Sequence, residues 1–318
     1  MKSIASAPAK IILFGEHFVV HGTKAILAAI DKRVTVTSTF TENKTIKVNS
    51  ELGTIEVLIS SSHEEVESNF RPFVYLANKI IQGNQNVNGL EITIDSDIPI
   101  GVGLGSSSAC CVAAAASISE LFKKLSSEEI LNLSIEAEKT IFPNTSGADC
   151  TVCTYGGMII YDKIGGIEKI DNTSDLNFII TNTMIPHSTK RSVEKVNKFK
   201  EDYDEEWDEM FVDMEGIIDT AIQAIRNNDV DTLGKEMYAN HQKLAGIGVS
   251  NDTLDDVICR LNKISLGSKI TGAGDGGCII ALVRDENVDK VPALLPKDKE
   301  CFSAKIDTKG VVWSTIEE

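Results

Sequence analysis

The sequence predicts an α+β protein made of two domains, and three observations lead to this prediction. The chain has 318 residues, which is long enough for two domains. Segments with the pattern of strands alternate with segments with the pattern of helices, as expected for layers of sheet and helix. Near residues 175–190 the pattern changes from mixed to almost wholly helical. We therefore expect one domain in residues 1–180 and a second in residues 181–318.

The expected strands are segments rich in apolar and β-branched residues. The first two contain mainly Ile, Val, Ala and Thr, and the next two alternate apolar and polar residues as half-buried strands do. In the first part of the chain the predicted strands are residues 4–14, 25–38, 53–59, 90–95, 156–162 and 178–183. The tail returns to strand within SKITGAGDGGCIIALV, residues 268–283, and ends with a short α/β portion.

The expected helices show apolar residues at helical spacing in residues 65–83, 109–124 and 127–142. The third opens with Ser126-Ser127-Glu128-Glu129, a capping sequence whose serine and glutamate side chains bond to the free backbone amides of a helix start. From Ser192 to Lys263 the periodicity is almost wholly helical.

Composition narrows the classes of function. The formal net charge of −16 argues against nucleic-acid binding through phosphate contacts. No apolar run approaches the roughly 20 residues needed to cross a bilayer. The N-terminal MKSIASAPAKIILFGEH lacks the long apolar stretch and the cleavage site of a secretory signal. We expect a cytoplasmic protein that binds neither nucleic acid nor membrane.

The seven cysteines show no disulfide-framework spacing, which fits a reducing compartment. Cys150 and Cys153 form a CxxC, a spacing used by zinc sites and redox motifs. A zinc site would need a second CxxC or paired histidines, and neither occurs at a suitable spacing. We therefore predict that both cysteines are buried structural residues.

The segment PIGVGLGSSSACCVAAAA, residues 99–116, is the strongest functional signal in the chain. Glycine lets backbone amides approach a ligand closely, and a helix start adds free N–H groups and the positive end of the helix dipole. Together they predict a phosphate site. Its candidate residues are Gly101, Gly103, Leu104, Gly105, Ser106, Ser107 and Ser108. The segment is neither a P-loop, which needs GxxxxGK[ST], nor a dinucleotide fingerprint, because Ser106 takes the third glycine position.

Three other segments carry candidate groups, each of which also has a purely structural interpretation. Lys10 enters an apolar strand, where a lysine either finds a partner or extends to solvent. Glu16 and His17 follow a glycine turn and could be surface residues. Glu138 could bind Mg²⁺ or lie on a solvated helix face, and Asp149 could accept a proton or belong to a turn. A second glycine cluster, TGAGDGG, occupies residues 271–277.

Taken together, these motifs resemble the GHMP kinase superfamily. The chain contains, in the expected order, K-x3-FGEH from Lys10, P-x-G-x-GLGSSS from Pro99 and KITGAGDGGC from Lys269. Within the superfamily, GEHFVVHG (residues 15–22) and NTSGAD with its E-x10-D spacing are similar to the mevalonate kinases. Asp275 stands where the commoner form of the third motif has glycine.

The resemblance implies a fold and a reaction. The implied fold has an N-terminal ribosomal-S5-like α/β domain and a C-terminal ferredoxin-like α+β domain. The implied reaction is transfer of the γ-phosphoryl group of ATP to the C5 hydroxyl of mevalonate, with Mg²⁺, in isoprenoid biosynthesis. A homodimer is a further expectation, because members of the superfamily are often dimers.

The resemblance also assigns roles to residues. Asp149 and Lys10 are the catalytic pair, and Ser107 and Glu138 hold Mg²⁺. The ATP phosphates contact the residues of the glycine–serine segment, with Thr189 and Gly274. Mevalonate contacts Lys10, Glu16, His17, Asp149, Gly272 and Ala273.

Two alternatives stay open at the level of sequence. Another kinase of the superfamily would act on phosphomevalonate, a sugar, homoserine or the C3 hydroxyl of mevalonate. A non-catalytic ligand sensor on the same fold would keep the glycine loops and lose the catalytic groups, whereas Lys10, Glu138 and Asp149 are all present.

Overall fold

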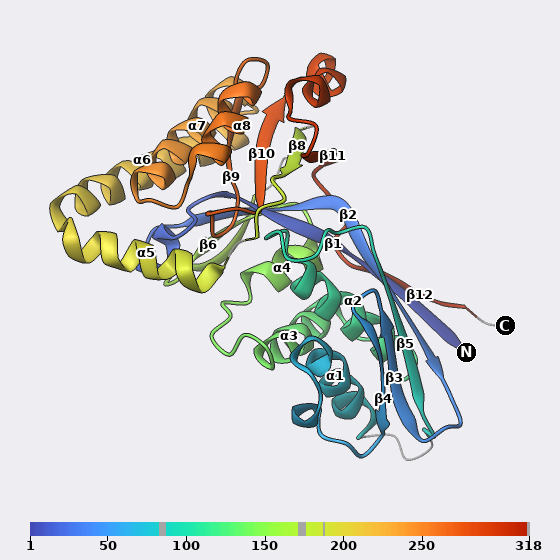
Figure 1. The fold of residues 1–318 in the computed structure, drawn as a ribbon. Helices are drawn as coiled ribbons and strands as arrows, with labels where there is room; N and C mark the ends of the chain where they lie inside the picture. Colours follow the sequence, from blue (N-terminus) through green and yellow to red (C-terminus); the bar gives the residue numbers. More distant parts are fainter. Residues whose placement is uncertain (83–86, 171–175, 187, 317–318) are drawn as a thin grey trace.

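Two β-sheets with helices packed against them form the protein (Figure 1). The computed structural model describes residues 1–82, 87–170, 176–186 and 188–316. One group of helices covers a face of the larger sheet, and a second group lies beside the smaller sheet (Figure 1). The chain begins and ends at the same end of the larger sheet (Figure 1). The predicted α+β architecture is therefore confirmed.

The larger sheet has eight strands, and six of them follow the order β12-β1-β2-β5-β3-β4. β6 pairs with both β2 and β7, outside this order. Among the described strands of this sheet, only β3 and β5 pair in parallel, and the other pairs are antiparallel. The strands are β1 (Lys2–Phe14), β2 (Ala25–Phe40), β3 (Thr45–Ser50), β4 (Gly53–Leu58), β5 (Leu90–Ser96), β6 (Met158–Asp162), β7 (Gly166–Ile170) and β12 (Val312–Ile316).

The smaller sheet is fully antiparallel, with the order β11-β8-β10-β9. Its strands are β8 (Asn177–Asn182), β9 (Gly267–Ile270), β10 (Cys278–Val283) and β11 (Glu300–Lys305). Numbered along the chain, these strands follow the order 4-1-3-2, which is the arrangement expected of a ferredoxin-like domain. The predicted boundary at residue 180 falls within β8, and β12 brings the chain back to the larger sheet.

Helix α2 is the central helix of the first part of the chain. It packs against β1, β2, α1, α3 and α4, and most of its residues are buried, as its alanines allow. The α-helices are α1 (Arg71–Ile81), α2 (Ser106–Glu120), α3 (Ser127–Lys139), α4 (Ala148–Tyr155), α5 (Thr189–Asp202), α6 (Asp204–Arg226), α7 (Val230–Gly246) and α8 (Asp252–Leu261). Short 3-10 helices are η1 (Phe18–His21), η2 (His63–Glu65), η3 (Ser68–Phe70) and η4 (Asp285–Leu294).

Several elements differ from the sequence prediction. The helix expected over residues 65–83 forms only from Arg71, because Pro72 fits the first turn of a helix and not its interior; Gly83 lies outside the described residues. The prediction missed β3 and β7, and it began α2 at residue 109 instead of Ser106. Asp149, expected in a turn, lies in the first turn of the short helix α4.

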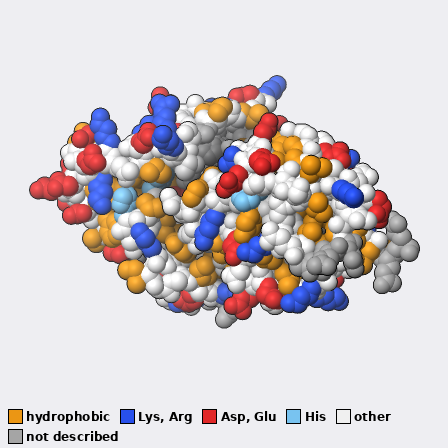
Figure 2. Space-filling view, turned by 90° about the horizontal axis from the view of Figure 1, so that it is seen from below, with side chains coloured by type: hydrophobic (Ala, Val, Ile, Leu, Met, Phe, Trp, Pro, Cys, Tyr) orange, Lys and Arg blue, Asp and Glu red, His pale blue; other side chains and the backbone are white. Residues whose placement is uncertain are grey.

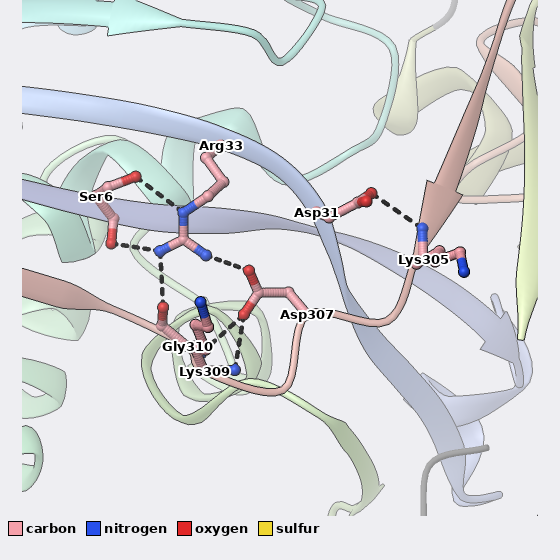
Figure 3. Close-up of polar contacts among 7 residues, drawn as sticks. All are labelled: Ser6, Asp31, Arg33, Lys305, Asp307, Lys309 and Gly310. Atoms are coloured by element: carbon pink, nitrogen blue, oxygen red, sulfur yellow. Dashed lines mark hydrogen bonds and ion pairs between the residues drawn. The ribbon is translucent and has the colours of Figure 1, made fainter. Parts of the chain in front are cut away.

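Arg33 helps to hold the segment after β11 against the larger sheet (Figure 3). Arg33 on β2 forms an ion pair with Asp307 and donates hydrogen bonds to the carbonyls of Ser6, at 2.7 Å, and Gly310, at 2.8 Å. The other oxygen of Asp307 accepts the backbone N–H groups of Lys309 and Gly310. These bonds fix the turn that returns the chain from β11 to β12.

The surface carries both signs of charge. Figure 2 shows acidic and basic side chains interspersed over the face it presents. Within the described parts of the chain, no helix combines the length and the apolar character that a membrane span requires.

Candidate active site

A cavity of about 770 Å³ brings the predicted segments together. Its walls come from β1 and the loop after it, the glycine–serine segment at the start of α2, the end of α3 with the loop that follows, and the N-terminus of α5. The residues from the sequence prediction that line it are Lys10, Glu16, His17, Gly101, Gly103, Leu104, Gly105, Ser106, Ser107, Ser108, Glu138, Asp149, Thr189, Gly272 and Ala273. Gly274 is not among the described residues that line the cavity. It packs against the backbone of Val249, since a Cβ atom on Gly274 would lie 2.3 Å from the carbonyl oxygen of that residue.

Lys10 and Asp149 form an ion pair inside this cavity. The ammonium of Lys10 lies 3.1 Å from Oδ2 of Asp149, and only 7% of the lysine side chain is exposed, against 34% of the aspartate side chain. An ammonium in an apolar strand is costly to bury without a partner. The structure therefore shows that Lys10 has a charged partner and does not extend to solvent. Of the two side chains, that of Asp149 is the more accessible to ligands.

The glycine–serine segment is built around the lysine. The backbone N–H of Lys10 donates to the carbonyl of Leu104 at 2.9 Å. Gly105, in the left-handed region with φ of 73°, leaves no room for a side chain, because a Cβ atom there would lie 2.5 Å from Cγ of Lys10. Only glycine satisfies both the backbone angle and the close approach.

The start of α2 offers donors to an anion. Ser106, Ser107 and Ser108 occupy the first three helical positions, and no side chain caps the helix. The first-turn amides of a helix lack intrahelical partners and carry the positive end of the dipole. All three serines line the cavity, so this helix start is suited to bind phosphate oxygens.

Glu138 is a buried carboxylate that forms no ion pair with any described residue. Its two oxygens accept hydrogen bonds from the hydroxyls of Ser108 and of Thr145, the latter at 2.5 Å. Ser107 Oγ is buried and has no hydrogen-bond partner in the described structure. A carboxylate without an ion-pair partner and a hydroxyl without a hydrogen-bond partner thus line the same cavity, and they fit Mg²⁺, which takes one or two protein oxygens and completes its shell with phosphates and water. No group of three or more His, Cys, Asp or Glu suited to a metal occurs among the described residues.

The loop after β1 contacts the segment KITGAGDGGC (residues 269–278), which we call the third glycine motif. Glu16 is 2% exposed and forms an ion pair with the fully buried Lys269 of β9. Burial raises the pKa of Glu16, and the neighbouring ammonium opposes this shift. His17 Nε2 lies 2.9 Å from the carbonyl of Ala273, and burial lowers the pKa of His17.

Lys269 was missed by the sequence analysis, although a lysine within the apolar segment SKIT is a signal of the same kind as Lys10. Its partner Glu16, which is predicted to contact substrate, accepts the Lys269 hydrogen bond with Oε1, while Oε2 is buried and has no hydrogen-bond partner in the described structure. Glu16 thus fixes the loop and also lines the cavity with His17, so both stay predicted substrate contacts.

The CxxC cysteines face the interior. Cys150 and Cys153 are both fully buried in α4. Burial raises the pKa of each thiol well above its usual value, so neither is a ready thiolate. This agrees with the predicted structural role.

Family models match one segment in each half of the chain. The model of the GHMP kinases N terminal domain matches residues 72–157, and that of the GHMP kinases C terminal matches residues 221–297. The mevalonate kinase of Thermococcus sibiricus is 34% identical over 328 residues, with 98% of each chain covered. The mevalonate kinase of Archaeoglobus fulgidus is 34% identical over 309 residues, covering 97% of this chain and 98% of the relative.

Solved structures agree with these matches. The Methanococcus jannaschii mevalonate kinase superposes with a TM-score of 0.85 at 29% identity, covering 96% of this chain and 98% of the other. The Lactococcus lactis galactokinase complexed with galactose shares the fold, with a TM-score of 0.79 at 21% identity and 98% and 95% coverage. With its two domains, its ordered motifs and these full-length relatives, the chain belongs to the GHMP kinases and, within them, to the mevalonate kinase family.

Proposed function

We propose that the protein transfers the γ-phosphoryl group of ATP to the C5 hydroxyl of mevalonate, giving 5-phosphomevalonate for isoprenoid biosynthesis. The observation that carries the proposal is the Lys10–Asp149 pair, at 3.1 Å, in the same cavity as the open start of α2. Phosphoryl transfer needs in-line positioning and neutralisation of charge more than covalent chemistry. This cavity supplies groups for both.

In this proposal the backbone amides from Gly103 to Ser108 hold the phosphates, with the positive end of α2 directed at them. Ser107 and Glu138 hold Mg²⁺, which neutralises phosphate charge when bound. Ser108 and Thr145 orient the Glu138 carboxylate by the hydrogen bonds they donate. Thr189 at the start of α5 extends the phosphate side of the cavity.

Asp149 accepts the proton of the acceptor hydroxyl, or orients it by accepting its hydrogen bond. The ammonium of Lys10, 3.1 Å from that carboxylate, stabilises the negative charge that develops on the attacking oxygen. Because Lys10 is anchored by Gly105 and Leu104, its position is preorganised before substrate binds.

The acceptor lies between the loop after β1 and the third glycine motif. His17, Gly272 and Ala273 line the cavity there, and the buried Glu16–Lys269 pair holds the two segments together. His17 is the proposed partner of the acceptor's carboxylate or hydroxyl groups. A cytoplasmic location and a homodimer stay predictions from the sequence.

A coupled assay of ADP release with Mg²⁺–ATP tests the proposal against mevalonate, phosphomevalonate, galactose and homoserine. We expect turnover with mevalonate alone and a product whose phosphate is on C5 by NMR. Turnover with another acceptor, or phosphate on C3, would replace the proposed substrate or position. ATP binding without ADP release on any acceptor would favour a ligand sensor.

A further inference from the structure

Helix α5 contributes a wall of the cavity although little of it is buried. Thr189 and Val193 line the cavity, and their spacing of four residues puts them on one face of the helix. Of its 14 residues only Ser192 and Val196 are buried. Helices are stabilised mainly by the packing of an apolar face, so packing alone holds α5 weakly.

The loop of the third glycine motif, by contrast, is held on both sides. The backbone N–H of Asp275 donates to the carbonyl of Val249 at 2.8 Å. The backbone N–H of Gly277 donates to the carbonyl of Ile185 at 3.0 Å. The Gly277 carbonyl in turn accepts the backbone N–H and the hydroxyl of Thr183. This loop is therefore a fixed support beside α5.

Asp275 links the fixed loop to the helix. Its Oδ1 lies 2.5 Å from the ammonium of Lys195, and its Oδ2 lies 3.5 Å from the hydroxyl of Ser192. Both partners belong to α5, three residues apart and so on one face. The carboxylate is only 16% exposed, so solvent screens the ion pair less than it screens a surface pair.

The backbone of Asp275 is unusual for a residue with a side chain. Its φ is 60°, in the left-handed region that glycine adopts more readily. The aspartate keeps this conformation while its side chain reaches α5. The hydrogen bonds of the loop hold the backbone of Asp275 in this conformation, and the contacts with Lys195 and Ser192 fix the position of its side chain.

We propose that Asp275 and Lys195 are positioning residues that hold the N-terminal half of α5 against the cavity, so that Thr189 and Val193 complete its wall. The role of this wall in nucleotide binding rests on the function proposed above. Neither Asp275 nor Lys195 lines the cavity among the described residues, so the pair acts through the position of the helix.

Steady-state kinetics and hydrogen exchange test this pair with four variants. Lys195→Met and Asp275→Asn each remove the ion pair, and asparagine tolerates the left-handed backbone of residue 275. Lys195→Arg keeps it. Lys198→Met, on the same helix, removes a lysine that forms no ion pair with a described residue, and serves as the control.

We expect Lys195→Met and Asp275→Asn to raise the KM for ATP about fivefold, the upper range for a partly exposed ion pair, with kcat changed by less than about twofold. The double variant should show no more than the larger single effect, because both changes remove one interaction. Lys195→Arg and Lys198→Met should keep the wild-type KM.

Backbone hydrogen exchange without substrate gives a second readout that does not depend on activity. The amides of residues 192–199 should exchange about fivefold faster in Lys195→Met and Asp275→Asn, and at the wild-type rate in Lys198→Met. If exchange in α5 is unchanged, the positioning role is overturned. If exchange rises while the KM for ATP stays at the wild-type value, the inferred effect on the cavity wall is overturned. If the wild type phosphorylates no acceptor, the proposed function fails, and hydrogen exchange still decides the structural link.

Discussion

The close packing of Gly105 against Lys10 leads to a prediction about catalysis. In a Gly105→Ala variant the new Cβ would lie 2.5 Å from Cγ and 2.9 Å from Cε of Lys10, whereas ordinary contacts begin at 3.4 Å. The lysine side chain therefore has to shift by about 0.9 Å. With Gly105 in place, the ammonium of Lys10 lies 3.1 Å from Oδ2 of Asp149, and the shift disturbs this position. A misplacement of about 1 Å in a catalytic group costs up to about 100-fold in rate. We expect turnover to fall about 10- to 100-fold.

The same substitution also strains the backbone, because Gly105 has φ of 73°. An alanine in the left-handed region costs about 1–2 kcal/mol of stability. Gly166→Ala is the matched control: its φ is 82°, nothing lies within 4 Å of the added Cβ, and it sits on β7, away from the cavity. Gly166→Ala therefore loses stability through the strained backbone alone, because it does not displace Lys10.

The assay is coupled ADP release with thermal unfolding measured in parallel. Both variants should lose thermal stability through the backbone cost, with a larger loss in Gly105→Ala because Lys10 is also displaced, and only Gly105→Ala should lose turnover. The reasoning is refuted if Gly105→Ala turns over at the rate of Gly166→Ala, since the position of the Lys10 ammonium would then be immaterial to the reaction.

Three further predictions concern single side chains. Asp149→Ala should lower kcat by about 10²–10⁴-fold while ATP binding persists, and near-normal turnover would remove Asp149 from the role of proton acceptor. Glu138→Ala should raise the Mg²⁺ concentration needed for half-maximal activity; an unchanged metal titration would assign the ion to other ligands. Burial lowers the pKa of His241 to about 4 in the folded state, from about 6.5 in the unfolded chain. The unfolded state therefore binds the proton more readily, and the fold is destabilised as the pH falls from about 6.5 to 4. The total loss in the free energy of unfolding is about 3 kcal/mol. Urea unfolding at pH 7 and pH 5 should therefore show a smaller loss for His241→Gln than for the wild type, and equal losses would contradict the assignment.

Local patterns were enough to predict much of the fold. Alternation located β4 and β5, and the capping sequence located the start of α3, where Ser126 and Glu129 do exchange hydrogen bonds. These elements are encoded by residues close together in sequence. Helix α4 was not predicted, because eight residues are too few for helical periodicity to appear, and its stability comes from burial against neighbouring elements.

The pairing of distant charges could not be predicted from local patterns. Glu16 and Lys269 are 253 residues apart, and only the packing of β9 beside the loop after β1 brings them together. Similarly, β12 joins β1 across nearly the whole chain. For the candidate site, the resemblance named Lys10, Asp149, Ser107 and Glu138, and the structure placed them in one cavity.

Burial decides between the structural and the functional interpretations of the charged residues. A solvated helix face would leave Glu138 exposed, and a lysine extending to solvent would leave Lys10 exposed, yet as whole residues they are 3% and 5% exposed. Lys10 has Asp149 as its counter-charge, whereas Glu138 has only hydroxyl partners among the described residues. A buried carboxylate without a cation is costly to the fold. Because Glu138 and the unpartnered hydroxyl of Ser107 line the same cavity, the two residues are suited to a ligand cation that supplies the missing charge when substrate binds.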